Sequence, residues 1–243
     1  MIANDDALEA VGYSLRNRVI AITGAAGGMG RTHVETCLRL GARVVMIDVT
    51  EPSPEQEVSD AQFVKASVSS ESDWQRVMEI VQRDYGRLDG LVNNAGILRD
   101  RMVFSMTDEE WDAVIRVHLR GHFMPTRAAA RYWRERSKAG DPVRASIVNT
   151  TSTSGLLSNP SQTNYGAAKS GIATFTEICQ KELHRYGVRS NAIAPAARTR
   201  LTATIPGSEE RNAQRQAEAE ATGFDKFAPE NISPMVAYLA TEH

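Results

Sequence analysis

The stretch Arg18-Val-Ile-Ala-Ile-Thr-Gly-Ala-Ala-Gly-Gly-Met-Gly30 is a short apolar run followed at once by a glycine-rich turn, and a segment with helical spacing comes next. Glycines at 24, 28 and 30 let the backbone turn tightly and approach a pyrophosphate. The N-terminus of the following helix favours the negative charge of that group. This stretch therefore predicts a strand, a turn and a helix that together bind a dinucleotide.

The alternation of strand and helix continues along the chain. Short runs rich in Val and Ile alternate with longer segments of helical period, which is typical of a parallel sheet with crossover helices. Strands are expected at 18–23, 43–48, 63–68, 90–95, 145–151 and 189–194, and helices at 28–40, 71–85, 107–136, 161–187 and 229–240. Thr107 and Glu110 form a capping-box pattern at one helix start. We expect a single-domain, doubly wound α/β Rossmann fold, with helices on both faces of a parallel sheet of six to seven strands.

Composition narrows the class of protein. The chain has 243 residues, 42% of them hydrophobic, which suffices for one substantial core. A formal net charge of −2 gives no basic field to attract nucleic acid or an anionic membrane. The acidic start lacks the pattern of a signal peptide, and we expect a cytoplasmic protein. Cys37 and Cys179 lie among apolar neighbours, so buried reduced thiols are expected rather than a disulfide or a metal site.

Tyr165 and Lys169 are the first candidate catalytic pair. They stand four residues apart, about one helical turn, so in a helix both side chains leave the same face. A neighbouring ammonium lowers the pKa of a phenol and suits it to proton transfer near neutrality. Ser152, thirteen residues before the tyrosine, can hold the reacting oxygen. Spacing alone also occurs by chance, and three flanking side chains are alternative hydroxyl donors: Thr151, Thr153 and Ser154.

Asp48 closes the second expected strand, 18 residues after Gly30. A carboxylate at that place can accept hydrogen bonds from both ribose hydroxyls and would repel a 2′-phosphate. NAD is therefore favoured over NADP as the cofactor. The alternative is an aspartate that merely ends a strand.

Taken together, these motifs resemble the short-chain dehydrogenase/reductase family over nearly the whole chain. The matching positions, in order, are Thr23–Gly30, Asp48, Asn93–Gly96, Ser152, Tyr165 with Lys169, and Asn191–Pro195. The resemblance implies cofactor contacts at Thr23, Gly24, Gly28, Met29, Gly30, Asp48, Ser67, Val68, Asn94, Ala95, Gly96, Tyr165, Lys169, Pro195, Arg198 and Thr199.

Two of these positions depart from the pattern of the family. Ser67, followed by Val68, stands where the family usually has an aspartate touching adenine, so the adenine contact is expected to be weaker. Pro195 is followed by Ala196 rather than glycine, which leaves Thr199 or Thr202 as the threonine that helps hold the pyrophosphate.

The resemblance also implies catalytic roles. Tyr165 is the expected general acid/base, Lys169 lowers its pKa and binds the nicotinamide ribose, and Ser152 donates a hydrogen bond to the substrate carbonyl. A fourth member, usually asparagine, is His118 here. In the family the backbone carbonyl at this position is thought to hold a water that relays protons to the lysine. Histidine has the same carbonyl, so we expect activity to survive and the ring to be a packed structural group rather than a titrating base.

A narrower resemblance involves the runs Asn93–Arg101 and Val117–Gly121. They are similar to the (3R)-hydroxyacyl-CoA dehydrogenase part of type 2 multifunctional β-oxidation enzymes, which is related to 17β-hydroxysteroid dehydrogenases. This implies an enzyme of lipid metabolism that transfers a hydride between NAD and a secondary alcohol or ketone, a 3-hydroxyacyl-CoA or a hydroxysteroid. The alternatives are an NADPH-dependent 3-oxoacyl-carrier-protein reductase, disfavoured by Asp48, and a catalytically idle dinucleotide-binding sensor, disfavoured by the Ser152, Tyr165 and Lys169 set.

Four expectations concern the rest of the chain. Residues 1–16 are expected to form an arm before a domain at 17–243, in which the polar segment 200–228 is either a substrate lid or a plain surface insertion. The chain stops where the family usually enters a final strand, so that strand is expected to be missing. A homotetramer or homodimer built partly from the 107–136 and 161–187 helices is expected. Arg99 and Arg101 are candidates for binding substrate, with ion pairs to Asp100 or Asp108 as the alternative.

Overall fold

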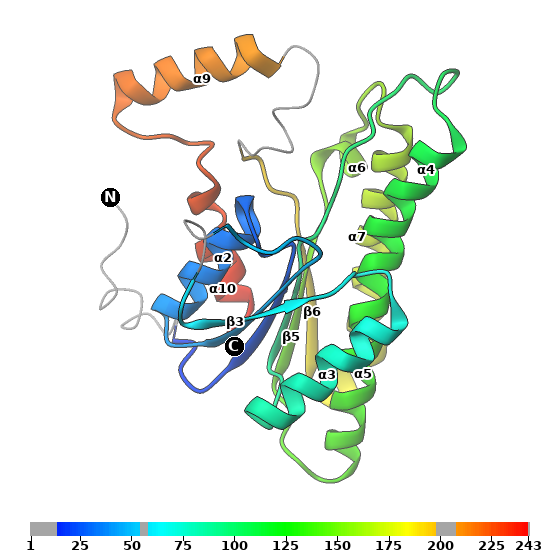
Figure 1. Cartoon of the computed structure of the whole chain (residues 1–243), viewed down its shortest axis with the longest axis vertical. Coiled ribbons are helices and arrows are strands. Elements are labelled where there is room, and N and C mark those ends of the chain that lie inside the picture. The colour runs from blue at the N-terminus through cyan, green and yellow to red at the C-terminus, as the bar shows by residue number, and fades with distance from the viewer. Residues whose placement is uncertain (1–13, 54–57, 198–207, 243) are drawn as a thin grey trace.

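A computed structural model of the protein describes residues 14–53, 58–197 and 208–242 (Figure 1). Its strands are β1 (Val19–Thr23), β2 (Arg43–Asp48), β3 (Ala61–Lys65), β4 (Gly90–Asn93), β5 (Ala145–Thr150) and β6 (Val188–Ile193). They form one six-stranded sheet in the order β3-β2-β1-β4-β5-β6, and every neighbouring pair is parallel. The single-domain, doubly wound fold predicted from the sequence is confirmed.

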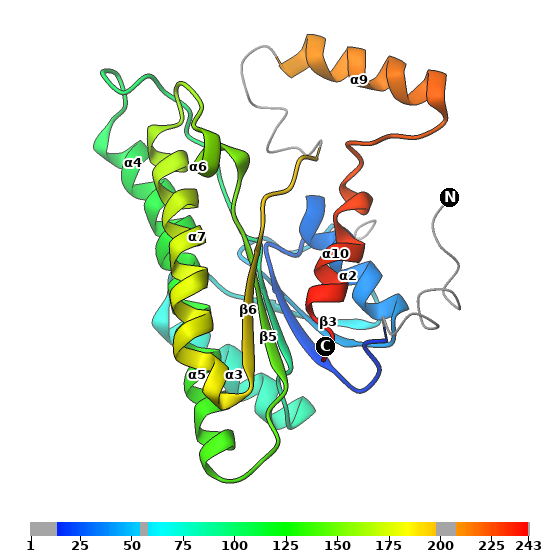
Figure 2. The ribbon, with the colours of Figure 1, turned by 180° about the vertical axis from the view of Figure 1, so that it is seen from behind.

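Helices cover both faces of the sheet (Figures 1 and 2). On one face lie α3 (Glu71–Tyr85), α5 (Gly121–Lys138) and α7 (Thr163–Leu183), and on the other α2 (Gly28–Arg39) and α10 (Ser233–Leu239). Each face buries its own apolar cluster, one around Trp74 and Trp133 and the other around Val34 and Val236. Val and Ile fill the strands because both sides of the sheet are covered. Both cysteines are free and buried.

The strand order reverses between β1 and β4, so the chain leaves these two strands in opposite directions and opens a crevice at their carboxyl ends. Gly24 follows β1 with a φ of +64°, and a Cβ there would lie 2.7 Å from the Cα of Ala95. Only glycine satisfies both the left-handed backbone and this close approach. The glycine turn thus brings the ends of β1 and β4 together at the crevice.

β3 differs from its predicted bounds of 63–68. It pairs with β2 from Ala61 opposite Val44 to Lys65 opposite Asp48, where β2 ends. Beyond this point β2 offers no further residues to pair with, so Ser67 leaves the sheet. The apolar residues near position 64 predicted that a strand lies here. They did not predict which residues of this strand pair with β2.

The long helix expected at 107–136 is divided into three. It consists of α4 (Asp108–Ile115), a π-helical turn η2 (Arg116–Arg120) and α5, and the capping box of Thr107 with Glu110 is present. A π turn adds one residue without ending the helix, so helical spacing alone does not reveal it.

Shorter helical segments complete the described chain: α6 (Thr153–Leu157), η3 (His184–Tyr186), α9 (Ser208–Thr222) and η4 (Pro229–Asn231). In both ribbon views α9 stands apart from the two helix layers, at the end of the molecule where α6 lies (Figures 1 and 2). Within the described ranges no helix combines the length and apolarity needed to cross a bilayer.

Candidate active site

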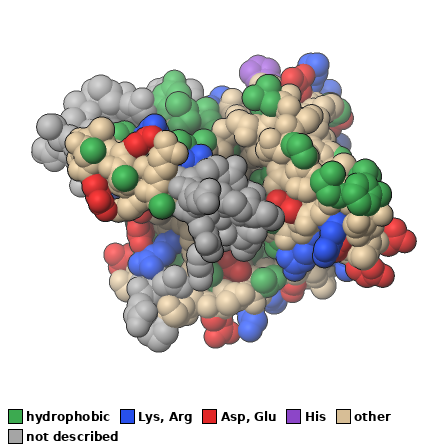
Figure 3. Space-filling view, turned by 90° about the horizontal axis from the view of Figure 1, so that it is seen from above, with side chains coloured by type: hydrophobic (Ala, Val, Ile, Leu, Met, Phe, Trp, Pro, Cys, Tyr) green, Lys and Arg blue, Asp and Glu red, His purple; other side chains and the backbone are tan. Residues whose placement is uncertain are grey.

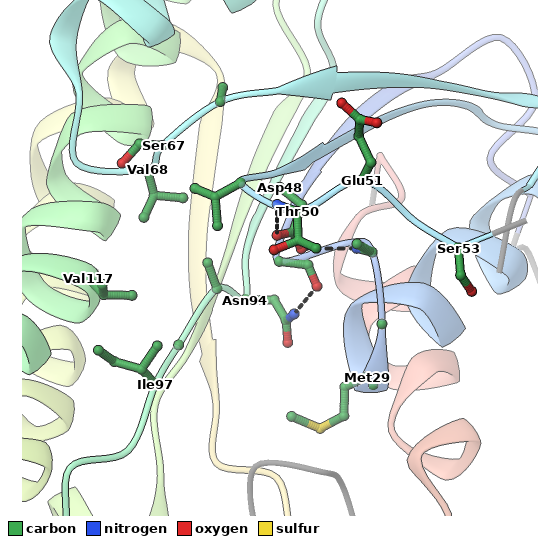
Figure 4. A pocket seen from close by; sticks show the side chains of 18 residues that line it. Met29, Asp48, Thr50, Glu51, Ser53, Ser67, Val68, Asn94, Ile97 and Val117 are labelled. Carbon is green, nitrogen blue, oxygen red and sulfur yellow. Dashed lines mark hydrogen bonds between the residues drawn. The ribbon is translucent and has the colours of Figure 1, made fainter.

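A cavity of about 650 Å³ opens at the carboxyl ends of β1, β2 and β4 (Figure 4). This volume falls in the range of cofactor sites. Nine residues predicted to contact the cofactor line it: Gly24, Gly28, Met29, Asp48, Ser67, Val68, Asn94, Ala95 and Gly96. The sequence did not predict cofactor contacts at nine other lining residues, namely Ala26, Gly27, Val49, Thr50, Glu51, Ser53, Ala66, Ile97 and Val117.

Asp48 is fixed by two backbone amides at the wall of this cavity. Its Oδ2 accepts a hydrogen bond from the amide of Ala26 at 3.0 Å, and its Oδ1 accepts one from the amide of Thr50 at 3.1 Å (Figure 4). Each carboxylate oxygen keeps a second lone pair. Asp48 and Glu51 are both acidic, and none of the described lining residues is lysine or arginine.

Thr23 and Gly30, also predicted to contact the cofactor, support the cavity wall from behind. The buried Thr23 hydroxyl accepts hydrogen bonds from the amides of Asn94 and Ala95, at 2.9 and 3.2 Å. A Cβ at Gly30 would fall 2.0 Å from the carbonyl oxygen of Gly24. Both residues therefore hold the glycine turn against the end of β4.

The structure brings Ser152, Tyr165 and Lys169 together where α6 meets α7. Ser152 caps α6, and its hydroxyl lies close enough to the Tyr165 phenol to lower the pKa of that group. The Lys169 ammonium lies 5.5 Å from the centre of the Tyr165 ring and donates to the carbonyl of Thr150 at 2.5 Å. Gly155 lets α6 approach this closely, since a Cβ there would lie 2.6 Å from the amide nitrogen of Ser170.

The protonation of Tyr165 and Lys169 is governed first by burial. Burial raises the pKa of Tyr165, the hydrogen bond with Ser152 lowers it, and the charge of Asp100 raises it further. Burial also lowers the pKa of Lys169 to about 7. The expected lowering of the Tyr165 pKa by the Lys169 ammonium stays a prediction, and removal from water disfavours the charged forms of both side chains.

His118 packs directly against Tyr165. Its side chain is buried, and its Nε2 lies 3.0 Å from the amide nitrogen and 2.8 Å from the carbonyl oxygen of Ile97. Burial, followed by the charge of Lys169, lowers the pKa of His118 well below its usual 6.5. The ring is therefore a packed and neutral group near pH 7.

A hydrogen-bonded network that the sequence did not reveal joins the loop after β4 to α6 and α7. Gln162 Nε2 donates to Asp100 Oδ2 at 2.8 Å, and the hydroxyl of Ser154 donates to Gln162 Oε1 at 2.8 Å. Asn164, fully buried, donates to the carbonyl of Arg99 at 3.0 Å and accepts from the amide of Tyr165 at 2.7 Å. The only signal in the sequence was the closeness of two amide residues to Tyr165.

The sequence model of the short chain dehydrogenase family matches residues 18–210 of the chain. The protein belongs to the short-chain dehydrogenase family. Hydroxyacyl-CoA dehydrogenase ChsB1 of Mycobacterium tuberculosis is 41% identical over 240 residues, which cover 93% of this chain and 74% of that protein. The 3-oxoacyl-[acyl-carrier-protein] reductase FabG of Thermotoga maritima is 33% identical, with 94% and 92% covered.

The peroxisomal hydratase-dehydrogenase-epimerase of Saccharomyces cerevisiae is 33% identical, and the match covers 94% of this chain but 25% of that larger protein. A short chain dehydrogenase from Mycobacterium avium has a similar structure, with a TM-score of 0.79 at 39% identity and 94% and 78% of the two chains covered. The 3-ketoacyl-(acyl-carrier-protein) reductase of Brucella melitensis complexed with NADH has a TM-score of 0.80 at 27% identity, with 94% and 92% covered. The predicted resemblance is confirmed.

The remaining predicted positions of this short-chain dehydrogenase have different outcomes. Arg101 forms an ion pair with Glu110 at 2.7 Å, so the alternative of an ion pair with Asp100 or Asp108 names the wrong partner for this arginine. Glu110 is held by its capping box within reach of Arg101. Arg99 is exposed and donates to the adjacent carbonyl of Leu98. Pro195 follows β6 and is half-buried, whereas Arg198, Thr199 and Thr202 lie outside the described residues.

Proposed function

We propose that the protein is an NAD-dependent dehydrogenase that oxidises the secondary alcohol of a 3-hydroxyacyl-CoA, with reversible hydride transfer. The observation that supports this most is the contact between the Ser152 hydroxyl and Tyr165 above the buried Lys169. A protein that only binds a dinucleotide has no need of such a proton-transfer set. The family membership and the names of the relatives point to the same class of reaction.

NAD fits the cavity on structural grounds. Gly24 lets the turn approach Ala95 closely, and α2 begins at the cavity-lining Gly28, beside which a Cβ would enter open space. A helix N-terminus favours a pyrophosphate. Asp48 places negative charge on a wall whose described lining includes no lysine or arginine, whereas Glu51 pairs with Lys65 at 3.4 Å. A 2′-phosphate would meet repulsion there, which supports NAD over NADP.

The proposed mechanism assigns one step to each of three side chains. The nicotinamide, when bound, supplies the hydride acceptor. Ser152 donates a hydrogen bond to the substrate oxygen, and Tyr165 takes the hydroxyl proton, because a secondary alcohol releases a hydride only as its proton leaves. The charge on Lys169 favours the phenolate and so opposes the effect of burial on the pKa of Tyr165.

An apolar rim supports a lipid-like substrate. Met102, Val103 and Phe104 on the loop after β4, and Leu156 and Leu157 in α6, are exposed, Phe104 to 82% and Leu157 to 80%. In Figure 3, hydrophobic side chains gather at the surface on the side of α4 and α6. This rim would contact an acyl chain, and Arg99 would contact a CoA phosphate. A hydroxysteroid is the second candidate, since it presents a comparable apolar surface.

The polar segment 200–228 is proposed to act as a lid over this rim. Its described part contains α9, which stands apart from both helix layers at the same end of the molecule as α6. Such a segment can close over a substrate without disturbing the sheet.

The test is a turnover assay with NAD or NADP and a panel of (3R)- and (3S)-hydroxyacyl-CoA esters and hydroxysteroids, following the absorbance of the reduced cofactor. We expect turnover of a hydroxyacyl-CoA with NAD, and Tyr165→Phe to lower kcat by at least about 100-fold while NAD still binds. Binding of NAD without turnover of any alcohol would instead favour a sensor.

Asp48→Asn tests the choice of cofactor separately. The amide keeps an oxygen for one of the two backbone amides that hold Asp48, but it removes the charge. The preference for NAD over NADP, as a ratio of kcat/KM values, should fall by about tenfold or more. Turnover of the unaltered enzyme with NADP and not with NAD would contradict the role of Asp48 and favour a reductase.

A further inference from the structure

A second buried histidine lies behind the Tyr165 and Lys169 pair. His122 stands in the first turn of α5, directly after the π turn, and its side chain is only 1% exposed. Its Nδ1 lies 2.7 Å from the backbone carbonyl oxygen of His118. A carbonyl only accepts, so Nδ1 carries the hydrogen, and Nε2 of the neutral ring is an acceptor. This ring thus bonds the carbonyl that the family resemblance assigns to a relay water.

The Nε2 atom of His122 is buried and has no hydrogen-bond partner within the described part of the chain. The carbonyls of Asn93 and Thr150, which end β4 and β5, face the ring, but neither meets the geometry of a hydrogen bond to Nε2. Carbonyls have no hydrogen to donate. A buried acceptor without a donor is costly, so the natural donor must be sought among the other neighbours.

Lys169 is that neighbour. Its ammonium donates to the same Thr150 carbonyl that faces His122. It is also close enough for its charge to lower the pKa of His122, which burial depresses to about 3. An ammonium has three hydrogens to donate. The hydrogen bond to Thr150 uses one of them, so two more hydrogens of Lys169 need acceptors.

We propose that His122 is a positioning residue for Lys169, in which the unprotonated Nε2 and the Thr150 carbonyl both accept hydrogen bonds from the ammonium, directly or through one buried water. This role rests on the proposed dehydrogenase function. Hydrogen bonds to the charged form offset the desolvation of a buried lysine. His122 thereby keeps Lys169 charged where Tyr165 must act as a base.

The titratable groups around this buried space fix the sign of the expected effect. The charge of Lys169 on α7 acts on His118 and His122, and the charge of Asp100, on the loop after β4, acts on Tyr165. His118 stays neutral, and Asp100 disfavours the phenolate. Lys169 is the remaining cation among these groups. Loss of the acceptor at His122 therefore lowers the pKa of Lys169 and raises that of Tyr165.

Two substitutions at His122 test the roles of its two ring nitrogens one at a time. Asparagine places an amide near Nδ1, so His122→Asn keeps a donor to the His118 carbonyl and removes the acceptor near Lys169. Glutamine places its amide oxygen near Nε2, so His122→Gln keeps that acceptor. We expect His122→Asn to move the acidic limb of kcat/KM for alcohol oxidation up by about one pH unit, and His122→Gln to move it much less.

A matched control uses another buried histidine. His33 in α2 has its Nδ1 2.8 Å from the Ser233 hydroxyl and an unpartnered Nε2, but it lies on the other face of the sheet. His33→Asn should lower the melting temperature and leave the acidic limb in place. An unmoved limb in folded His122→Asn, or equal shifts in both His122 variants, would overturn the proposal.

A second measurement does not depend on any substrate. Nitrogen-15 NMR of labelled histidines, with His122 assigned from the spectrum of His122→Asn, reports which ring nitrogen carries the hydrogen. We expect a neutral ring with its hydrogen on Nδ1 near pH 7. A hydrogen on Nε2 would overturn the proposal. If no alcohol is oxidised but the Nδ1 tautomer is found, the proposed function fails while the structural role of His122 stands.

Discussion

The ring of His118 meets the ring of Tyr165 edge-on, with centroids 5.1 Å apart and planes at 89°. This contact and the hydrogen bond between His118 Nε2 and the backbone of Ile97 fix the His118 ring in place. We infer that the ring has a structural role and does not act as a base. His118→Asn should therefore keep kcat within about fivefold of the original and leave the acidic limb in place, because the pKa of His118 already lies well below neutrality. The pH profile of kcat/KM checks this, and a displaced acidic limb would show that the ring titrates during catalysis.

Gly96 is the position that His118 restricts most directly. A Cβ at Gly96 would lie 2.5 Å from Cε1 of His118, and the packed ring has little room to retreat. Gly96→Ala should weaken NAD binding by about tenfold or more, because the displaced backbone lines the cofactor cavity. Calorimetric titration measures the affinity.

The double variant Gly96→Ala/His118→Asn supplies the control. Asparagine is smaller than histidine, so it should relieve part of the clash and recover part of the affinity. Additive losses in this double-mutant cycle would mean that the two positions do not interact.

Local patterns explain why the fold was predictable. The strand Val19–Thr23, the glycine turn and the aspartate ending β2 are each specified by neighbouring residues, and their order along the chain fixes a parallel sheet. Nine predicted cofactor residues line one cavity for the same reason, since the carboxyl ends of parallel strands meet at one edge.

The unpredicted features depend on contacts between segments far apart in the sequence. Asp100 meets Gln162 across 62 positions, and the Lys169 ammonium meets the carbonyl of Thr150 across 19. The π turn that places the His118 carbonyl beside His122 looks like ordinary helix in spacing. The effect of burial on Tyr165 could not be weighed before its surroundings were known. Spacing identified the reactive groups, but their protonation depends on tertiary packing.

His33 should make the protein sensitive to acid. Burial lowers its pKa from 6.5 to about 4, so between these values the unfolded chain binds a proton that the folded chain does not. The contribution of His33 to the free energy of unfolding is therefore fully present above its pKa in the unfolded chain. It is lost as the pH falls toward the pKa of His33 in the folded protein, by up to about 3 kcal/mol.

Denaturant unfolding across this acidic range tests the role of His33. His33→Asn retains a partner for Ser233 but removes the titrating ring, so its free energy of unfolding should vary less with pH than that of the original protein. Equal slopes in the two proteins would show that other groups cause the acid sensitivity.

Asp100→Asn should make Tyr165 a better base in mildly acidic solution. The carboxylate of Asp100 raises the pKa of Tyr165, and its Oδ1 has no hydrogen-bond partner in the described chain. Asparagine keeps an oxygen that accepts from Gln162 and removes only the charge. The phenolate then becomes easier to form, so the acidic limb of alcohol oxidation should move to lower pH, the opposite of the shift expected for His122→Asn.

Asp84→Asn is the matched control for Asp100→Asn. Asp84 lies near the C-terminal end of α3 and pairs with Arg83, so its loss changes the net charge equally without touching the network around Tyr165. The two variants are compared by the pH dependence of kcat/KM at saturating NAD. An acidic limb that stays in place in Asp100→Asn, or that moves equally in Asp84→Asn, would mean that the field at Tyr165 is not set by Asp100. Burial and the Ser152 hydrogen bond would then determine how readily the tyrosine gives up its proton.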